Sequence, residues 1–200
     1  MTSGRKPGSG SFRRVKTRDL AYIALFAALT AVLGLVPTIP IGPVPITVQN
    51  LGLMLAGSIL GARRGFLSQL LFLVLVAVGL PVLGGSGGLG AIFSPYAGYV
   101  LAWPVGAFLV GLLTERFWGR YNVVWGVLAN VLGGVLVVDA VGALVFGLVE
   151  HSAFWPVFVS GFLVFLPGDV AKAFLAAVVA DGVRRSYPVI ERPRKTVAAP

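Results

Sequence analysis

Long apolar segments, separated by short polar or glycine- and proline-rich connections, fill most of this chain. Charged residues gather at the ends of these segments and are nearly absent from their interiors. A helix needs about 20 mainly apolar residues to cross the hydrocarbon core of a bilayer. The pattern therefore predicts an all-α polytopic membrane protein with six transmembrane helices. We expect the spans at residues 20–36, 47–60, 66–80, 95–113, 123–148 and 167–182, with a short or re-entrant helix over 154–165.

The composition indicates one membrane domain. Of the 200 residues, 57% are hydrophobic and 12% are charged, whereas about a quarter of the residues of a soluble domain carry charge. Residues 19–185 are predicted to form the membrane domain, between a disordered basic tail over 1–18 and a second basic tail over 186–200. The chain has no cysteine and one histidine. This excludes disulfides and leaves little for a metal site, so we expect no metal and no cofactor.

The positions of the basic residues predict the topology. The net charge of +9 does not indicate a nucleic-acid partner, because the basic residues lie at the ends of apolar segments rather than on a soluble face. They fall in the two tails and in two short connections, at Arg63, Arg64, Arg116 and Arg120. These alternate with connections that contain no Lys or Arg: 37–46, 81–94 and 149–166. Basic loops stay in the cytoplasm, so we expect both termini there and the other three loops on the outer face.

Two of the outer connections have unusual compositions. Residues 37–45 contain four prolines, which cannot continue a helix. They are predicted to form either a stiff lid, with Ile41 and Val44 covering an apolar ligand, or a rigid external turn. Residues 81–91 are rich in glycine and match G-x-G-x-x-G, but that dinucleotide fingerprint needs a strand before it and a helix after it. We interpret this segment as a pocket-lining or re-entrant loop; the alternative is a flexible external loop.

Small residues are spaced four apart in the first span. Ala24 and Ala28, and equally Ala27 and Ala31, form small-xxx-small pairs that let another helix approach closely. Both pairs fit an interface with a partner protein, and both also fit packing inside the chain's own bundle.

Ionisable side chains inside the predicted spans are candidates for a functional site, because charge is costly in hydrocarbon. Asp169 and Lys172 lie three residues apart, on one face of a helix. Pro167 and Gly168 predict that a helix starts at Pro167, which places Asp169 near its first turn. Asp139 lies well inside the fifth span, either as a second pocket carboxylate or facing a water-filled gap.

Asp169 and Lys172 place a strong acceptor beside a strong donor. A cap and an ion pair would explain them in a soluble helix, but an apolar span does not need Lys172 in order to form. A neutral ligand with N–H donors and a carbonyl, such as a urea or an amide, would use both groups. A carboxylate would use Lys172 alone, and a proton relay would use Asp169 with Asp139. The second span opens with further polar groups that cap a helix or line a pocket: Thr47, Gln49 and Asn50.

Several short motifs follow one another along nearly the whole apolar part, from about residue 19 to 185. They are residues 24–31, 43–49, 61–69, 79–90, 94–99 and 165–172, the last reading Phe-Leu-Pro-Gly-Asp-Val-Ala-Lys. Each motif is weak alone, and in this order they are specific. The chain resembles the substrate-binding (S) component of biotin transporters, the BioY family of energy-coupling-factor transporters.

The resemblance implies a fold, a function and a set of partners. The fold is six membrane helices, and the function is high-affinity capture of biotin from the outer side of the bacterial cell membrane. The implied partners are a transmembrane coupling protein and two ATPase subunits, which drive vitamin uptake with ATP. The chain would thus be a transport subunit and not an enzyme.

The resemblance also implies roles for particular residues. Asp169 and Lys172 correspond to the pair that meets the ureido ring of biotin. Gly84 to Gly88 correspond to a pocket-closing loop in which Ser86 is the only polar side chain. Ala24 and Ala28 correspond to the surface that meets the coupling protein. The full set of expected substrate-binding residues is Thr47, Gln49, Gly84, Gly85, Ser86, Gly87, Gly88, Tyr99, Asp169 and Lys172.

Two other classes of function are alternatives. A proton-coupled carrier, another small-molecule membrane transporter or an intramembrane enzyme would use Asp139 and Asp169. The sequence offers no nucleophile, base and orienting group for an enzyme. A membrane scaffold would instead act through the alanine face of the first span.

Overall fold

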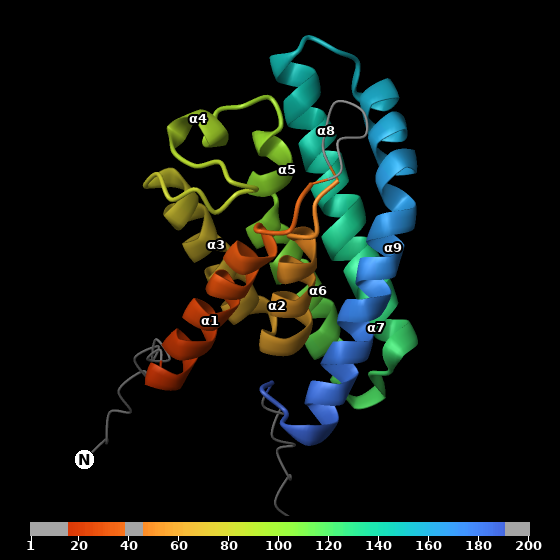
Figure 1. Ribbon diagram of the computed structural model, residues 1–200. Helices are drawn as coiled ribbons and strands as arrows, with labels where there is room; N and C mark the ends of the chain where they lie inside the picture. The colour runs from red at the N-terminus through yellow and green to blue at the C-terminus, as the bar shows by residue number, and fades with distance from the viewer. Residues whose placement is uncertain (1–15, 39–45, 191–200) are drawn as a thin grey trace, which may run out of the picture.

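Helices make up nearly all the regular structure of the residues that the computed structural model describes, 16–38 and 46–190 (Figure 1). The elements are α1 (Thr17–Leu33), α2 (Asn50–Leu60), α3 (Ala62–Ala77), α4 (Leu89–Ile92), α5 (Ala97–Leu101), α6 (Trp103–Arg116), a 3-10 turn (Trp118–Arg120), α7 (Val123–Asn130), a π-helical segment (Val131–Leu136), α8 (Val137–Val149) and α9 (Phe154–Ser186). α5 leads into α6, and α7 continues through the π-helical segment into α8. Apart from the four-residue α4 and the 3-10 turn, six longer helical segments therefore run along the described chain, which confirms the all-α fold. Ile41, Val44 and most of both predicted tails lie outside the described residues.

The helical segments have apolar outer surfaces, and some of them have the length of a membrane span. Among the described residues, three are long and apolar enough to cross a bilayer: Ala97–Arg116, Val123–Val149 and Phe162–Ser186. α1 and α3 have 17 and 16 residues, and α2 is a shorter apolar helix of 11. Large apolar side chains such as Leu25, Leu144 and Leu148 stay exposed on outward faces. Lipid tails are as apolar as leucine, so these faces suit a bilayer.

α2 lies at the centre of the bundle. Its residues from Leu51 to Leu60 are all buried, and it packs against α1, α3, α6 and α9. A helix that is apolar on every side needs neighbours on every side. A Cβ at Gly65 of α3 would lie 3.1 Å from the Cα of Gly57 in α2, so these two helices touch backbone to backbone. Such close approach at small residues is typical of helices that pack within a membrane.

α9 corrects the predicted start of the last span. It runs unbroken from Phe154 to Ser186 with Pro167 in its interior, whereas the sequence predicts a short helix over 154–165 and a new helix from Pro167. Proline removes one backbone hydrogen bond and tends to kink a helix. Transmembrane helices nevertheless tolerate it, because neighbouring groups satisfy the freed backbone. Asp169 is therefore an interior residue of a long helix and not an N-terminal cap.

The predicted basic turn at Arg63 and Arg64 also needs correction. Both arginines belong to the first turn of α3, which begins at Ala62. Gly61 makes the reversal between α2 and α3 with a φ of 85°, a left-handed value that favours glycine. The carboxylate of Glu115 then accepts a hydrogen bond from the Ala62 N–H (2.9 Å), so a side chain from α6 caps α3.

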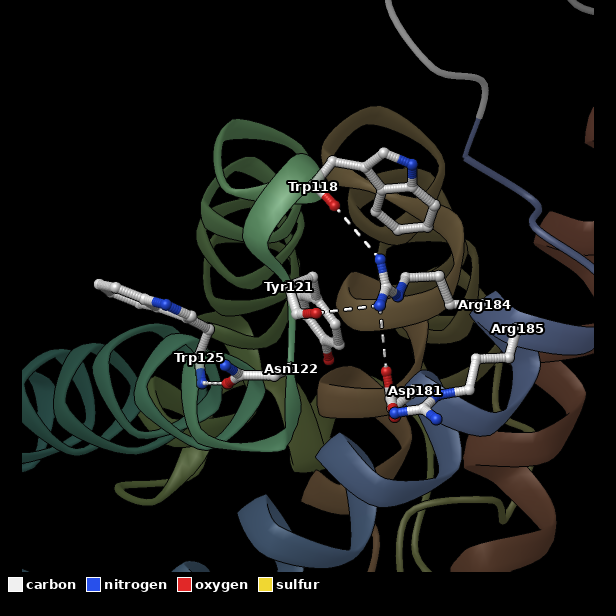
Figure 2. A network of polar contacts seen from close by, with 7 residues as sticks. All are labelled: Trp118, Tyr121, Asn122, Trp125, Asp181, Arg184 and Arg185. Atoms are coloured by element: carbon white, nitrogen blue, oxygen red, sulfur yellow. Dashed lines mark hydrogen bonds and ion pairs between the residues drawn. The ribbon is translucent and has the colours of Figure 1, made fainter.

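Arg184 ties the connection between α6 and α7 to the C-terminal end of α9 (Figure 2). Its guanidinium donates to the carbonyls of Trp118 (3.3 Å) and Tyr121 (2.9 Å) and pairs with Asp181 (3.4 Å). It also lies 5.7 Å from the Trp118 ring centroid and 5.4 Å from that of Tyr121, within the range of a cation–π contact. Burial raises the pKa of Tyr121 to about 12.

The basic segments gather at this same end of the bundle. Arg64 pairs with Asp19 of α1 (2.9 Å) and donates to the carbonyl of Val189, beyond α9 (3.1 Å). The start of α1 and the end of α9 accordingly lie at the same end of the bundle in Figure 1, and the glycine-rich segment before α4 lies toward the other end. The charge alternation along the sequence thus corresponds to two distinct ends of the structure.

Candidate functional site

A cavity of about 590 Å³ lies at the end of the bundle opposite the Arg184 contacts. Its wall comes from the start of α2, the glycine-rich segment, α5, α8 and the middle of α9. Of its 22 lining residues, ten are apolar or aromatic, three are glycine and nine have polar or charged side chains. The lining residues are Thr38, Ile46, Thr47, Gln49, Asn50, Leu83, Gly84, Ser86, Gly87, Gly90, Ala91, Ser94, Tyr96, Ala97, Tyr99, Val100, Trp103, Val138, Asp139, Phe165, Asp169 and Lys172.

Asp169 and Lys172 form an ion pair on the wall of this cavity, as their spacing predicts. Lys172 Nζ lies 2.6 Å from Asp169 Oδ1, and the two side chains are 13% and 5% exposed. The ammonium also donates to the Thr47 carbonyl and to Asn50 Oδ1, both at 2.8 Å. An ammonium has three donors, so all three are engaged. Pairing and hydrogen bonding offset the desolvation cost of burying these two charges.

Asn50 completes the cluster; it was a candidate for a cap or a pocket wall but was not among the expected substrate-binding residues. Its Nδ2 donates to Asp169 Oδ1 (2.8 Å) while its Oδ1 accepts from Lys172. One carboxamide therefore presents a donor to Asp169 and an acceptor to Lys172 at the same time. The available signal was a polar residue at the opening of an apolar span. The sequence could not show that the start of α2 meets the middle of α9.

Gln49 lines the cavity but uses its amide to hold the glycine-rich segment. Its Nε2 donates to the carbonyls of Thr30 in α1 (3.0 Å) and Val82 (2.8 Å), and its Oε1 accepts from the Gly84 N–H (3.1 Å). The side chain is 1% exposed. A Cβ at Gly34 would fall 2.5 Å from both Gln49 Nε2 and the Val82 carbonyl. Gln49 therefore joins α1, α2 and the cavity wall.

The glycine-rich segment forms a tight turn against the cavity. Leu83 and Ser86 exchange backbone hydrogen bonds of 3.0 and 2.8 Å, and the two residues between them, Gly84 and Gly85, have φ values of 54° and 83°. Two consecutive positive φ values are typical of a type I′ turn, which favours glycine at both positions. A side chain at Gly87 would meet the carbonyl of Leu80. This part of the cavity wall is accordingly built from backbone.

The predicted glycines therefore divide into two groups. Gly84, Ser86 and Gly87 line the cavity, whereas Gly85 and Gly88 are not among its lining residues. Gly85 and Gly88 have open space where a Cβ would stand, and both have a φ of 83°. Their role in this structure is to shape the backbone, not to form the wall.

Aromatic side chains line the side of the cavity next to the polar cluster. Tyr99 is 8% exposed, and its ring lies edge-on to Phe165, with 6.2 Å between the centroids. Gly142 of α8 admits the Tyr99 ring, because a Cβ there would collide with it. The Trp103 ring stacks on the Phe72 ring, with 5.5 Å between the centroids. The cavity therefore combines a flat apolar wall with a small polar patch, the usual make-up of a small-molecule site.

Asp139 is a second carboxylate in the cavity wall, the first of the two alternatives that the sequence left open. It is 5% exposed, and its Oδ2 has no hydrogen-bond partner. Among the described residues, no group of three or more His, Cys, Asp or Glu side chains is arranged to hold a metal ion.

These features define a class of protein, a helical membrane bundle that encloses a small-molecule cavity at one end. The chain belongs to the BioY family, whose model matches residues 7–189. This confirms the resemblance predicted from the motifs, and the family consists of transport components rather than enzymes.

Individual relatives cover nearly the whole chain. It is 47% identical to the biotin transporter BioY of Rhizobium etli, over 88% of this chain and 98% of that protein. It is 41% identical to the biotin transporter BioY of Rhodobacter capsulatus, over 86% and 95%. Among solved structures it is similar to the S-component for biotin from an ECF-type ABC transporter. That likeness has a TM-score of 0.80 and 37% sequence identity, over 88% of this chain and 95% of that one.

The role of Gln49 can be tested without any ligand. Gln49→Leu removes the two hydrogen bonds that hold residues 82–84 and a third to Thr30, so we expect faster amide hydrogen exchange at Gly84 and its neighbours, measured by mass spectrometry in detergent. The matched control is Gln69→Leu, which removes a buried glutamine bonded to Thr30 and Ser68 but not to this segment. Equal exchange at Gly84 in the two variants would contradict the assignment.

Proposed function

We propose that this chain is the substrate-binding component of a biotin uptake transporter and that Asp169 and Lys172 bind the ureido ring of biotin, at the position that the Asn50 carboxamide occupies in the free protein. Relatives that match nearly the full chain are biotin transporters by name, and the similar solved structure is an S-component for biotin. The observation that carries the residue assignment is the carboxamide of Asn50, held between Asp169 and Lys172.

The Asn50 carboxamide supports the assignment because it has the same chemistry as one edge of a cyclic urea. Each consists of a carbonyl oxygen beside an N–H. Asp169 takes the N–H of this unit and Lys172 donates to its oxygen, at 2.8 Å each. All three donors of Lys172 are engaged, so a ligand carbonyl must replace one acceptor. We infer that the ureido edge of biotin takes the place of the Asn50 carboxamide, since the Thr47 carbonyl is fixed in the backbone.

The remainder of the cavity suits the rest of the biotin molecule. Tyr99, Trp103, Phe165 and Val138 give apolar surface for the sulfur-containing ring and the aliphatic chain. A volume of about 590 Å³ falls within the range of about 300–1,000 Å³ that is typical of small-molecule sites. The glycine-rich turn lies across this wall, where it closes over the ligand.

The distribution of charge supports capture from the outside. The basic segments lie at the Arg184 end of the bundle, and the positive-inside rule assigns such an end to the cytoplasm. The cavity lies at the other end and faces outward, and both termini are cytoplasmic. The membrane in this proposal is the bacterial plasma membrane.

The surface of α1 supports docking of a transmembrane coupling protein. Ala24 and Ala28 are exposed on the outside of the bundle, whereas Ala27 is 1% exposed and Ala31 is half-buried. The outward pair is therefore available for close helix packing with a partner, and Ala27 serves the chain's own core. With no nucleotide-binding motif of its own, the chain obtains energy from ATP through that coupling protein and two ATPase subunits, and it binds biotin with high affinity.

The proposed site predicts how charge removal affects biotin binding. Hydrogen bonds to charged groups are worth about 1.5–3 kcal/mol, and about 1.4 kcal/mol is a factor of ten. Asp169→Asn and Lys172→Met should therefore each weaken biotin binding by roughly 10- to 100-fold, measured by calorimetry on purified protein in detergent. Arg185→Met is the control, since Arg185 lies on the same helix with its side chain 73% exposed. Affinity equal to wild type in both site variants would exclude this site.

Displacement of the Asn50 carboxamide by biotin predicts that Asn50→Ala changes the stability of the free protein and its stabilisation by biotin in opposite directions. Asn50→Ala leaves Asp169 and Lys172 with fewer partners, so the melting temperature without ligand should fall. The shift in melting temperature on adding biotin should become larger than in wild type, because biotin no longer competes with the Asn50 side chain. A smaller shift would mean that Asn50 holds the ligand directly.

The alanine face of α1 predicts a defect in transport but not in binding. Leucines at Ala24 and Ala28 would keep the coupling protein at a distance, so biotin uptake in cells that hold the full transporter should be lost. Calorimetric affinity of the purified subunit should stay unchanged. Ala171→Leu, an exposed alanine on α9, is the control and should transport normally. Retained uptake in the double α1 variant would mean that the coupling protein docks on another surface of the chain.

The main alternative is a proton-coupled carrier that uses Asp139 and Asp169, which both line the cavity. Asp169 is already engaged by Lys172 and Asn50, which disfavours a free proton relay. Uptake that needs a proton gradient and no ATPase partner would favour the carrier.

A further inference from the structure

Asp139 carries a hydrogen-bonding capacity that the protein does not use. Among the described residues that line the cavity, it has the one fully buried side-chain oxygen without a hydrogen-bond partner, Oδ2. No arginine or lysine in the described part of the chain forms an ion pair with it; the described ion pairs involve Asp19, Asp169 and Asp181. A buried acceptor without a donor is costly to the folded protein. The position therefore calls for a donor that comes from outside the chain.

Asp139 lies in the part of α8 that lines the cavity. The residue lies in α8 just after the π-helical segment Val131–Leu136, and π-helical turns are frequent at functional sites. One turn further along, Gly142 receives the ring of Tyr99, so the same face of α8 borders the cavity. Asp139 is also within electrostatic reach of both Asp169 and Lys172. The χ2 torsion angle of aspartate has a broad distribution, so either carboxyl oxygen can turn toward the cavity.

A cyclic urea has one donor more than Asp169 and Lys172 can match. Its ring presents an N–H, a carbonyl and a second N–H in sequence. The contacts of the Asn50 carboxamide show how one N–H and the carbonyl are matched, by Asp169 and Lys172. The second N–H requires a further acceptor, because a buried N–H without a partner would cost affinity.

We propose that Asp139 accepts the second ureido N–H and so acts as a specificity-determining residue for the cyclic urea. Asp169, Lys172 and Asp139 then form an acceptor, donor, acceptor array that complements the ring. The biotin carboxylate lies away from Asp139, since two carboxylates would repel each other. This inference rests on the proposed function.

The test compares two variants with two ligands. Asp139→Leu removes the acceptor, and Asp139→Asn keeps one acceptor oxygen in a side chain of the same shape. By calorimetry, Asp139→Leu should bind biotin at least about tenfold more weakly than wild type, and Asp139→Asn should fall between the two. Biotinamide, in which the carboxylate is blocked, should show the same loss, because the contact is at the ring. Leu144→Ala, a change on the outward face of α8, is the matched control.

Thermal unfolding separates a binding role from a structural one. Without ligand, Asp139→Leu should melt at or above the wild-type temperature, because the unpartnered oxygen is gone; its stabilisation by biotin should be smaller. Wild-type affinity in both Asp139 variants, or a loss seen with biotin but not with biotinamide, would overturn the inference and leave the proposed function intact. Wild-type protein that fails to bind biotin would overturn both.

Discussion

The ion pair between Asp169 and Lys172 sets the main constraint on this structure. Two charges inside an apolar helix are tolerated only if neighbouring groups complete their hydrogen bonds. The start of α2 provides those groups, through the Thr47 carbonyl and the Asn50 carboxamide. This requirement fixes α2 against the middle of α9, at the point where the bundle opens into a cavity. A contact that stabilises the helices thereby also creates a site for a polar, uncharged group.

The wall opposite this pair depends on a second polar residue of the same segment. The amide of Gln49 is hydrogen-bonded to α1 and to the glycine-rich turn. Its neighbour Asn50 is instead hydrogen-bonded to Asp169 and Lys172. Asn50 thus contacts the Asp169–Lys172 pair, and Gln49 positions the glycine-rich segment of the cavity wall.

How far the sequence could predict this site differs from residue to residue. Asp169 and Lys172 were predictable because charge inside an apolar span is rare. The part played by Asn50 was not, because it depends on contact between α2 and α9, which are far apart in sequence. Pro167 misled the prediction of helix boundaries, since local propensity indicated a helix start where the tertiary structure keeps α9 continuous. The glycines were recognised as a group, but only the structure separates Gly84 and Gly87, which line the cavity, from Gly85 and Gly88, which shape the turn.

A structure of the protein with biotin bound tests the central claim most directly. The account predicts the ureido carbonyl within hydrogen-bonding distance of Lys172 Nζ, a ureido N–H at Asp169, and the Asn50 carboxamide displaced from its present position between them. Biotin bound with its ureido ring elsewhere in the cavity, and with Asn50 still bridging Asp169 and Lys172, would contradict the account.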